Sequence, residues 1–278
     1  MLLIATLAGL CWLDFHSRAP LVWLLPIALL LALAASSEFL HLVAGQAIRP
    51  LGAIVLAGNL LIVASNVVPI WLLDSTAYPT GRLAWPLMAM VLCTLAAFAG
   101  EMWRYEQPGK VTTNLATAVL ALVYVGILMS FLVQLRAIPP NRTGMTLLLA
   151  VILISKFCDI GAYTVGRLMG RHKLAPRLSP GKTVEGGIGG LAFAALGAYL
   201  VLGVFAVHAW WQWLLFGLLI GAAGMLGDLA ESLLKRDLKQ KDSSVWVPGF
   251  GGVLDVLDSV LYAAPVGYLC WWVGLVGS

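Results

Sequence analysis

Long apolar segments follow one another along almost the whole chain, and they restrict its fold more than any other feature. A transmembrane helix needs about 20 mostly apolar residues, and polar breaks divide the sequence into about nine apolar segments, of which the first is short. They fall near residues 1–13, 20–43, 51–73, 83–100, 111–134, 145–165, 184–207, 209–227 and 251–276. The sequence therefore predicts an all-α, polytopic bundle of about nine transmembrane helices.

The composition excludes a water-soluble globule. Of the 278 residues, 61% are hydrophobic and 11% are charged, whereas soluble domains carry about 25% charged residues. The four cysteines are far apart and show no CxxC spacing, so neither a disulfide framework nor a zinc site is expected. Residues 1–13 lack the basic start and the cleavage site of a signal peptide. We therefore expect an integral membrane protein of the inner, cytoplasmic membrane, with its first span at the N-terminus.

The basic residues predict the orientation in the membrane. If the connecting loops are assigned alternately to two sides, one side carries twelve of the 17 Lys and Arg residues and the other carries four. Cytoplasmic loops are enriched in Lys and Arg. With nine spans, the N-terminus is then cytoplasmic and the C-terminus lies outside.

Charged residues divide the chain into two regions. Residues 1–150 are expected to form weakly charged transmembrane helices, with Glu38 as an exception, and residues 151–278 to form a catalytic region. Charges inside spans are costly and are candidates for function. Lys156, Asp159 and Tyr163 share one helix face, where an internal ion pair is the alternative interpretation.

The segment 166–183 carries five basic residues and no acidic one. A positive anchor on the cytoplasmic side would explain this charge. However, Leu178–Thr183 forms a polar turn that leads into Glu185 and the next span, where helix-start N–H groups can bind phosphate. The GxxxG pairs at 186/190 and 217/221 predict close helix contacts.

The strongest chemical signal lies near the end of the chain. Asp228, Glu231, Ser232 and Lys235 recur on one helix face, and Asp255 and Asp258 begin the last span. A divalent cation with oxygen ligands would balance these carboxylates. The alternative is that they pair with Lys235, Arg236 or Lys156. Together with the basic segment, the carboxylates indicate metal-dependent phosphoryl chemistry at the cytoplasmic face.

These residues resemble the signature of the phosphatidate cytidylyltransferase (CDP-diacylglycerol synthase) family. The resemblance covers about the last 120 residues; before them only hydropathy is similar, apart from a local match at Glu38-Phe39. One block contains Ala162-Tyr163, Gly166-Arg167, His172-Lys173-Leu174 and the run from Ser179 to Gly186. The other contains Ser232-Leu-Leu-Lys235-Arg236, Lys241-Asp242, Pro248-Gly249, Gly251-Gly252, Asp255 and Asp258.

The resemblance implies transfer of CMP from CTP to phosphatidate, with Mg²⁺ and a second, monovalent cation (K⁺) at the site. By position, Asp228 and Asp255 correspond to the metal ligands. The catalytic candidates are Asp228, Asp255, Asp258 and Lys235. The substrate-binding candidates are Ser179, Lys182, Thr183, Glu185, Arg236, Lys241, Asp159 and Tyr163. The expected partners are CTP, phosphatidate and membrane lipids, with a homodimer allowed and no nucleic acid.

The chain departs from the family signature at two main positions. Phe250 stands where the family has His, and Val256 where it has Arg; Ser244 occupies a position often held by Gly. We expect activity despite these changes, with Lys156, Lys235 or a more tightly bound cation replacing the lost Arg charge. The alternatives are a transferase for another lipid phosphate, a non-catalytic relative, and an ion-coupled transporter.

Overall fold

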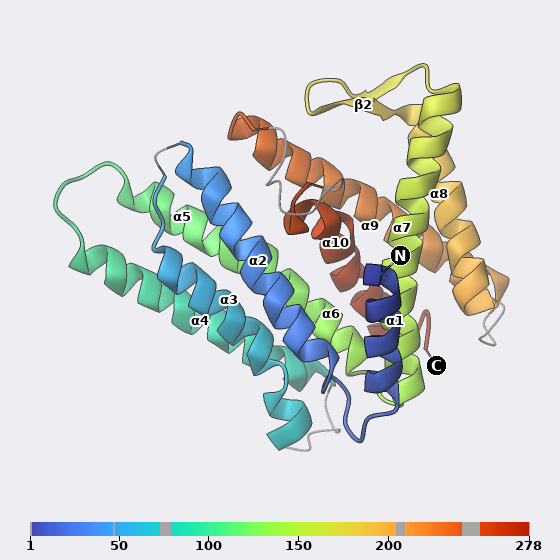
Figure 1. Ribbon diagram of the computed structural model, residues 1–278, viewed down its shortest axis with the longest axis horizontal. Coiled ribbons are helices and arrows are strands. Elements are labelled where there is room, and N and C mark those ends of the chain that lie inside the picture. The colour runs from blue at the N-terminus through green and yellow to red at the C-terminus, as the bar shows by residue number, and fades with distance from the viewer. Residues whose placement is uncertain (1, 47, 73–78, 204–208, 241–250, 278) are drawn as a thin grey trace. The chain divides into compact units, whose positions relative to one another are not determined.

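The computed structural model describes residues 2–46, 48–72, 79–203, 209–240 and 251–277. Helices dominate these residues, and one short β-hairpin follows α7 (Figure 1). The helices are α1 (Leu2–Phe15), α2 (Leu24–Ala44), α3 (Gly52–Ser65), α4 (Pro79–Trp103), α5 (Val111–Ala121), α6 (Leu128–Arg136), α7 (Asn141–Met169), α8 (Val184–Ala198), α9 (Trp210–Asp237) and α10 (Val253–Trp272). Short π-helical segments occupy Val68–Leu72, Leu122–Ile127 and Tyr199–Gly203, and the strands are β1 (Lys173–Ala175) and β2 (Ser179–Thr183).

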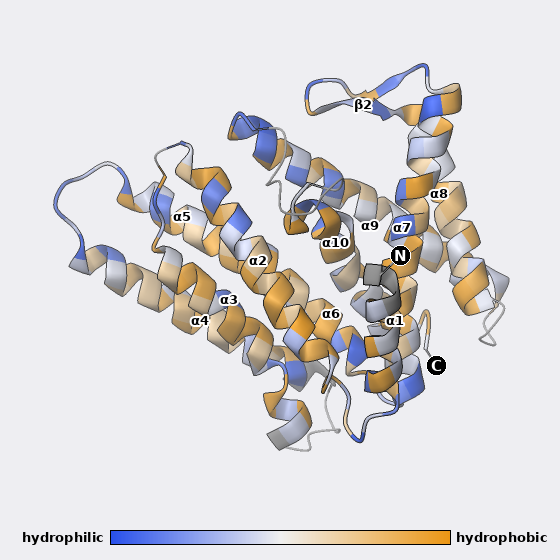
Figure 2. Cartoon of the chain, viewed as in Figure 1, coloured by the Kyte–Doolittle hydropathy of each residue, from blue (hydrophilic) through white to orange (hydrophobic). Residues whose placement is uncertain are grey.

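The described part of the chain contains 8 helices that are long and apolar enough to cross a membrane. The π-helical segment Leu122–Ile127 joins α5 and α6 into one span, Val111–Arg136. The predicted first span forms α1, whose 14 residues rise about 21 Å, short of the roughly 30 Å hydrocarbon core. The polytopic helical fold is thus confirmed, with eight helices of spanning length instead of nine. Hydrophobic residues cover most of the helices, and hydrophilic ones lie at many of the helix ends and along α7 and α9 (Figure 2).

The helices form two units by contact. The first comprises residues 1–141 and 243–254, and the second comprises 142–242 and 255–278. The predicted division at residue 150 falls within α7. The predicted division separated weakly charged helices from a catalytic region, which contacts do not test, so it stays a prediction.

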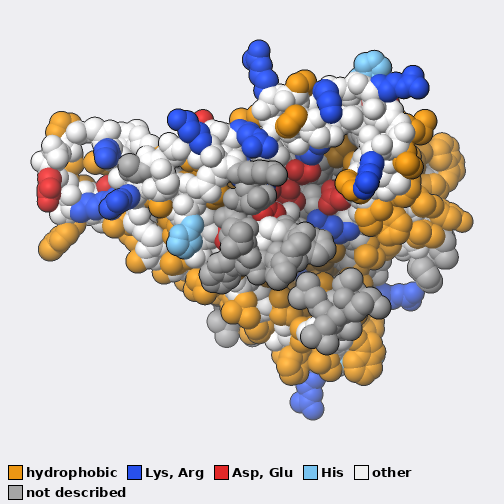
Figure 3. All heavy atoms as spheres, turned by 45° about the horizontal axis from the view of Figure 1, so that its top comes forward, with side chains coloured by type: hydrophobic (Ala, Val, Ile, Leu, Met, Phe, Trp, Pro, Cys, Tyr) orange, Lys and Arg blue, Asp and Glu red, His pale blue; other side chains and the backbone are white. Residues whose placement is uncertain are grey.

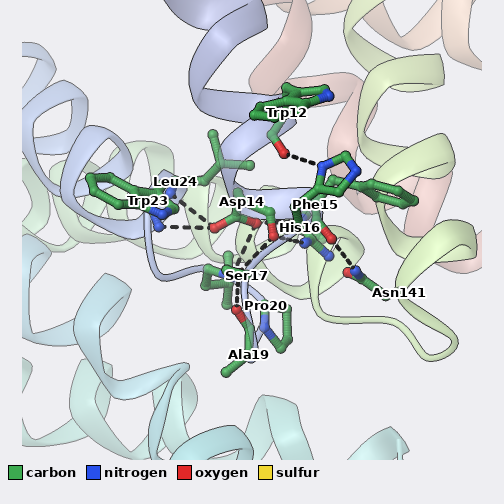
Figure 4. A network of polar contacts seen from close by, with 12 residues as sticks. Trp12, Asp14, Phe15, His16, Ser17, Ala19, Pro20, Trp23, Leu24 and Asn141 are labelled. Atoms are coloured by element: carbon green, nitrogen blue, oxygen red, sulfur yellow. Dashed lines mark hydrogen bonds and ion pairs between the residues drawn. The ribbon is translucent and has the colours of Figure 1, made fainter.

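A buried ion pair fixes the N-terminal end of the first unit (Figure 4). Asp14 and Arg136 are both buried, and Arg136 Nε donates to Asp14 Oδ2 over 2.7 Å. The same carboxylate accepts backbone N–H groups from Leu21 (3.2 Å), Trp23 (2.9 Å) and Leu24 (3.3 Å). Asp14 therefore satisfies N–H groups at the start of α2, which have no partner within the helix, while it holds α1 against α6.

The second unit contains α7, α8, α9, most of α10 and the hairpin. A Cβ added at Gly186 would lie 2.7 Å from the Ala162 carbonyl oxygen on α7, and one added at Gly221 would lie 2.7 Å from Ala194 Cβ on α8. These distances are too short for a side chain, so both GxxxG pairs lie at close helix contacts, as predicted.

The segment 166–183 differs from the predicted loop. Helix α7 continues to Met169, and β1 and β2 then pair antiparallel, with Lys173 opposite Thr183 and Ala175 opposite Ser179. The predicted polar turn Leu178–Thr183 is therefore mainly strand β2. The hairpin returns the chain to the start of α8 and presents Lys182 beside that helix.

Candidate active site

A lysine of the hairpin binds a carboxylate of α9. Lys182 Nζ lies 2.6 Å from Asp228 Oδ2, and the lysine nitrogen is buried. Lys182 belongs to β2 and Asp228 to the stripe of polar residues predicted on α9. The contact thus joins two motifs that the sequence separates by two helices.

A second lysine links α9 to α10. Lys235 Nζ lies 2.6 Å from Asp255 Oδ1 and 3.2 Å from Glu231 Oε2. Glu231 and Lys235 are one helical turn apart on α9, whereas Asp255 belongs to the first turn of α10. The predicted alternative, in which Lys235 balances the carboxylates, is therefore realised for Asp255.

A third lysine lies within the span of α7. Lys156 Nζ donates to Asp159 Oδ2 (3.0 Å), to Ser259 Oγ (3.0 Å) and to the carbonyl oxygen of Val256 (3.1 Å). The Ser259 hydroxyl also lies 3.2 Å from Asp159 Oδ2. The ion pair predicted from the spacing of Lys156 and Asp159 is thus present, with both side chains partly exposed, and it extends to α10. Ser259 was missed in the sequence, although it lies four residues after Asp255 on the same helix face.

Asp258 is buried between these groups. Its side chain is close enough for electrostatic interaction with Asp228, Lys156 and Asp159. Figure 3 shows acidic side chains gathered on one face of the molecule, with Lys and Arg side chains around them. The acidic cluster, as we call it, consists of Asp159, Asp228, Glu231, Asp255 and Asp258, with Lys156, Lys182 and Lys235 as its cations.

The donor chemistry of the acidic cluster fits a hard divalent cation. Its five carboxyl groups outnumber its three lysines by two, and a divalent cation would balance carboxylates that the lysines do not. Glu231 Oε1 is buried without a donor among the described residues, and the Glu231 side chain lies beside the Asp255 carboxyl group, so a cation there would meet oxygens of both residues. No three Asp, Glu, His or Cys side chains within the described ranges stand at metal-binding spacing. The lysines now bound to Asp228 and Asp255 would have to move for these carboxylates to bind metal.

The remaining hairpin candidates make local contacts. Thr183 caps α8 by accepting the Gly186 N–H at 3.1 Å. Glu185 accepts the N–H groups of Arg171 (3.0 Å) and His172 (3.2 Å), and its other oxygen lies 2.6 Å from the His172 ring. Both residues hold the hairpin on α8 and thus have a structural role. Their predicted contact with substrate would be a second role.

The last candidates lie around or outside this cluster. Arg236 Nε donates to the Leu178 carbonyl oxygen at 3.1 Å, which ties α9 to the hairpin. Tyr163 is exposed, and its hydroxyl accepts from Arg167 at 2.9 Å rather than facing Asp159. Ser179 pairs with Ala175 in the hairpin. Lys241 and Phe250 lie outside the described residues.

One contact with the start of α10 comes from the N-terminal half of the chain. Glu38 on α2 is buried and accepts the backbone N–H groups of Val253 (2.9 Å) and Leu254 (2.8 Å) at the start of α10. It therefore caps the helix that carries Asp255 and Asp258. The sequence signal was a lone carboxylate near the end of an apolar span, although its partner was not predictable.

Comparison with known proteins identifies relatives along nearly the whole chain. The pattern of the cytidylyltransferase family matches residues 1–273. A phosphatidate cytidylyltransferase of Synechocystis sp. is 32% identical over 263 residues, which are 83% of this chain and 82% of the relative. That of Bacillus subtilis is 33% identical over 180 residues, or 64% of each chain. That of Staphylococcus saprophyticus is 40% identical over 153 residues, covering 54% of this chain and 56% of the relative.

Proposed function

Because this chain belongs to the cytidylyltransferase family, we propose that it transfers CMP from CTP to phosphatidate. The products are CDP-diacylglycerol and pyrophosphate. The observation that supports this proposal most directly is the acidic cluster with its three lysines. Phosphoryl transfer depends mainly on positioning and charge neutralisation, and the cluster brings both signs of charge together on α7, α9, α10 and the hairpin.

The reaction joins two anions, so the basic residues have a defined role. A phosphate oxygen of phosphatidate attacks the α-phosphorus of CTP, and the bond from that phosphorus to the β-phosphate oxygen breaks. Lys182, Lys235 and Arg236 would neutralise the triphosphate and the leaving pyrophosphate. No strong general base is needed, because a phosphate monoester is already anionic near pH 7.

Asp228 and Asp255 would hold Mg²⁺, which supplies Lewis-acid stabilisation of the phosphate oxygens. Lys182 and Lys235 are bound to these same carboxylates, over 2.6 Å each. Each lysine is therefore already beside the position where metal-bound phosphate would lie. We include a second, monovalent cation, an active site facing the cytoplasm of the inner membrane, and a homodimer in the same proposal.

The decisive experiment is a transfer assay with purified protein. Labelled CTP is incubated with phosphatidate, an ether-lipid phosphate or an isoprenoid phosphate, and the lipid product is identified by mass spectrometry. We expect Mg²⁺-dependent CMP transfer that is fastest to phosphatidate. Transfer only to another acceptor would change the assigned substrate, and no transfer to any acceptor, together with ion flux in proteoliposomes, would favour the transporter.

The contact of Lys182 with the nucleotide can be tested separately. Lys182→Ala should raise the KM for CTP more than the KM for phosphatidate, because the removed charge would face the triphosphate. Lys173→Ala is the matched control, since Lys173 lies on the neighbouring strand of the same hairpin. Equal CTP kinetics in both variants would mean that Lys182 serves only the ion pair with Asp228.

A further inference from the structure

The three lysines of the acidic cluster form ion pairs with different carboxylates. Lys182 is bound to Asp228, and Lys235 is bound to Asp255 and Glu231. Asp159 and Asp258 are left to Lys156, which binds the first directly and lies near enough to act on the second. Lys156 is therefore the lysine that balances the charges of Asp159 and Asp258.

The placement of Lys156 is costly unless it has a function. It is near the middle of α7, a 29-residue helix that is apolar enough to cross the membrane. A charge at that depth is unfavourable and is expected to face partners inside the bundle. Its three hydrogen-bond acceptors are Asp159 on its own helix and Val256 O and Ser259 on α10. Lys156 therefore crosses from α7 to the helix that carries Asp255 and Asp258.

One of the two acceptors on α10 is the backbone carbonyl oxygen of Val256, the position where the sequence departs from the signature that it resembles. Val256 provides no charge between Asp255 and Asp258, and Lys156 Nζ lies 3.1 Å from its carbonyl oxygen. Resting on the proposed function, we infer that Lys156 is a positioning residue for CMP transfer. From α7 it provides the positive charge that the resembled signature places at position 256 of α10.

If the charge on α7 replaces one on α10, then moving it back to α10 should restore the activity of a variant that lacks Lys156. Lys156→Met removes the charge and should lower kcat/KM for CTP by about tenfold or more, because the more negative cluster repels the triphosphate. Val256→Arg introduces a charge from the other helix. In the double variant Lys156→Met/Val256→Arg, we expect activity to return to within about threefold of wild type.

Two matched controls separate charge from other effects. Lys156→Met/Val256→Leu fills space at position 256 without charge and should not restore activity. Lys110→Met removes a lysine from the exposed N-terminal end of α5 and should leave kcat/KM unchanged. Additive losses in Lys156→Met/Val256→Arg, or wild-type kinetics in Lys156→Met, would overturn the inference.

A second readout works without turnover. The melting temperature in detergent with EDTA should fall in Lys156→Met, because Asp159 and Asp258 lose their cation, and Val256→Arg should restore it. If wild type transfers no CMP to any acceptor, the proposed function fails. The inference about charge would still be decided by this thermal measurement, and the absence of restoration there would refute it.

Discussion

Asp228 and Asp255 are the two side chains on which the proposed chemistry depends most. Each is held 2.6 Å from a lysine that would meet the triphosphate. Asp228→Asn and Asp255→Asn keep the shape but remove the charge that would hold Mg²⁺. We expect each to lower kcat by about 10²-fold or more, roughly 3 kcal/mol of transition-state stabilisation, as measured by CMP transfer over a Mg²⁺ titration.

Asp237→Asn is the control for this prediction. Asp237 is the last residue of α9 and is exposed, so the same change should leave both kcat and the Mg²⁺ dependence as in wild type. Circular dichroism and size-exclusion chromatography should show that all three variants are folded. Near-normal kcat with unchanged Mg²⁺ dependence in Asp228→Asn or Asp255→Asn would remove that residue from the metal site.

Contacts between residues of one helix could be predicted from the sequence, but contacts between residues of different helices could not. The 3.6-residue period placed Glu231 and Lys235 on one face, and they are indeed in contact. The partners Lys182–Asp228 and Lys235–Asp255 are 46 and 20 residues apart in the sequence. Which lysine pairs with which carboxylate depends on how closely the glycines let the helices approach. Composition alone does not determine that distance.

At the scale of elements, Gly227 controls the contact between α9 and α10. A Cβ added there would lie 2.9 Å from Tyr262 Cβ and nearer still to the Asp258 carbonyl oxygen. Backbone at such a distance cannot move aside without shifting the helix. Gly227→Ala should therefore cost about 1–3 kcal/mol of stability and reduce CMP transfer, since Asp228 and Asp258 would separate.

Gly187→Ala is the matched control for Gly227. The nearest atom to a Cβ at Gly187 is Met225 Sδ at 3.9 Å, which is an ordinary contact. Alanine also favours the helix over glycine by about 1 kcal/mol, so this variant should be as stable as wild type or more stable. Equal melting temperatures for Gly227→Ala and Gly187→Ala would mean that α9 and α10 are not closely packed there.

The Glu38 cap on α10 gives a second prediction at this scale. Glu38→Ala leaves the N–H groups of Val253 and Leu254 without their acceptor, and losing such a cap costs about 1 kcal/mol. Because Asp255 follows directly, we expect kcat to fall as well. Glu38→Gln keeps one oxygen acceptor and should retain more activity, whereas the exposed Glu106→Ala should behave as wild type. Identical loss in Glu38→Ala and Glu38→Gln would argue for a role of the charge beyond capping.

The helices were predictable as elements, but their ends and the hairpin were not. The apolar pattern predicted an end near residue 165, whereas α7 continues to Met169. Backbone hydrogen bonds continue a helix after its apolar face has ended. The hairpin strands contain only 3 and 5 residues, and β2 includes Pro180, so no period of alternating hydrophobicity marked them.

For the whole molecule, the sequence predicted the polytopic fold because each span is a local feature of about 20 apolar residues. The exception is α1, where hydrophobicity was sufficient and length was not. A cytoplasmic N-terminus requires α1 to cross the membrane, so that orientation stays a prediction. The orientation of the second unit depends only on α7, α8, α9 and α10.

The second unit gives a direct test of topology. Helix α7 has 29 residues and is about 43 Å long, more than the roughly 30 Å hydrocarbon core. Arg142, in its first turn, and Arg171, after its end, should therefore lie on opposite sides of the membrane. Two further spans, α8 and α9, return the chain to the hairpin side, as the contact of Arg236 with Leu178 O requires. Lys239, which follows α9, should then share a side with Arg171.

Single cysteines in a variant without the four native cysteines would report these sides. In intact cells, a membrane-impermeant maleimide should label Arg142→Cys, and it should label Arg171→Cys and Lys239→Cys only after the cytoplasmic face is opened. All three should react in detergent, which controls for accessibility. The positive charges of the hairpin predict this direction. If Arg171→Cys and Lys239→Cys reacted from opposite sides, Lys182 and Asp228 could not share a site, and the proposed active site would have to be abandoned.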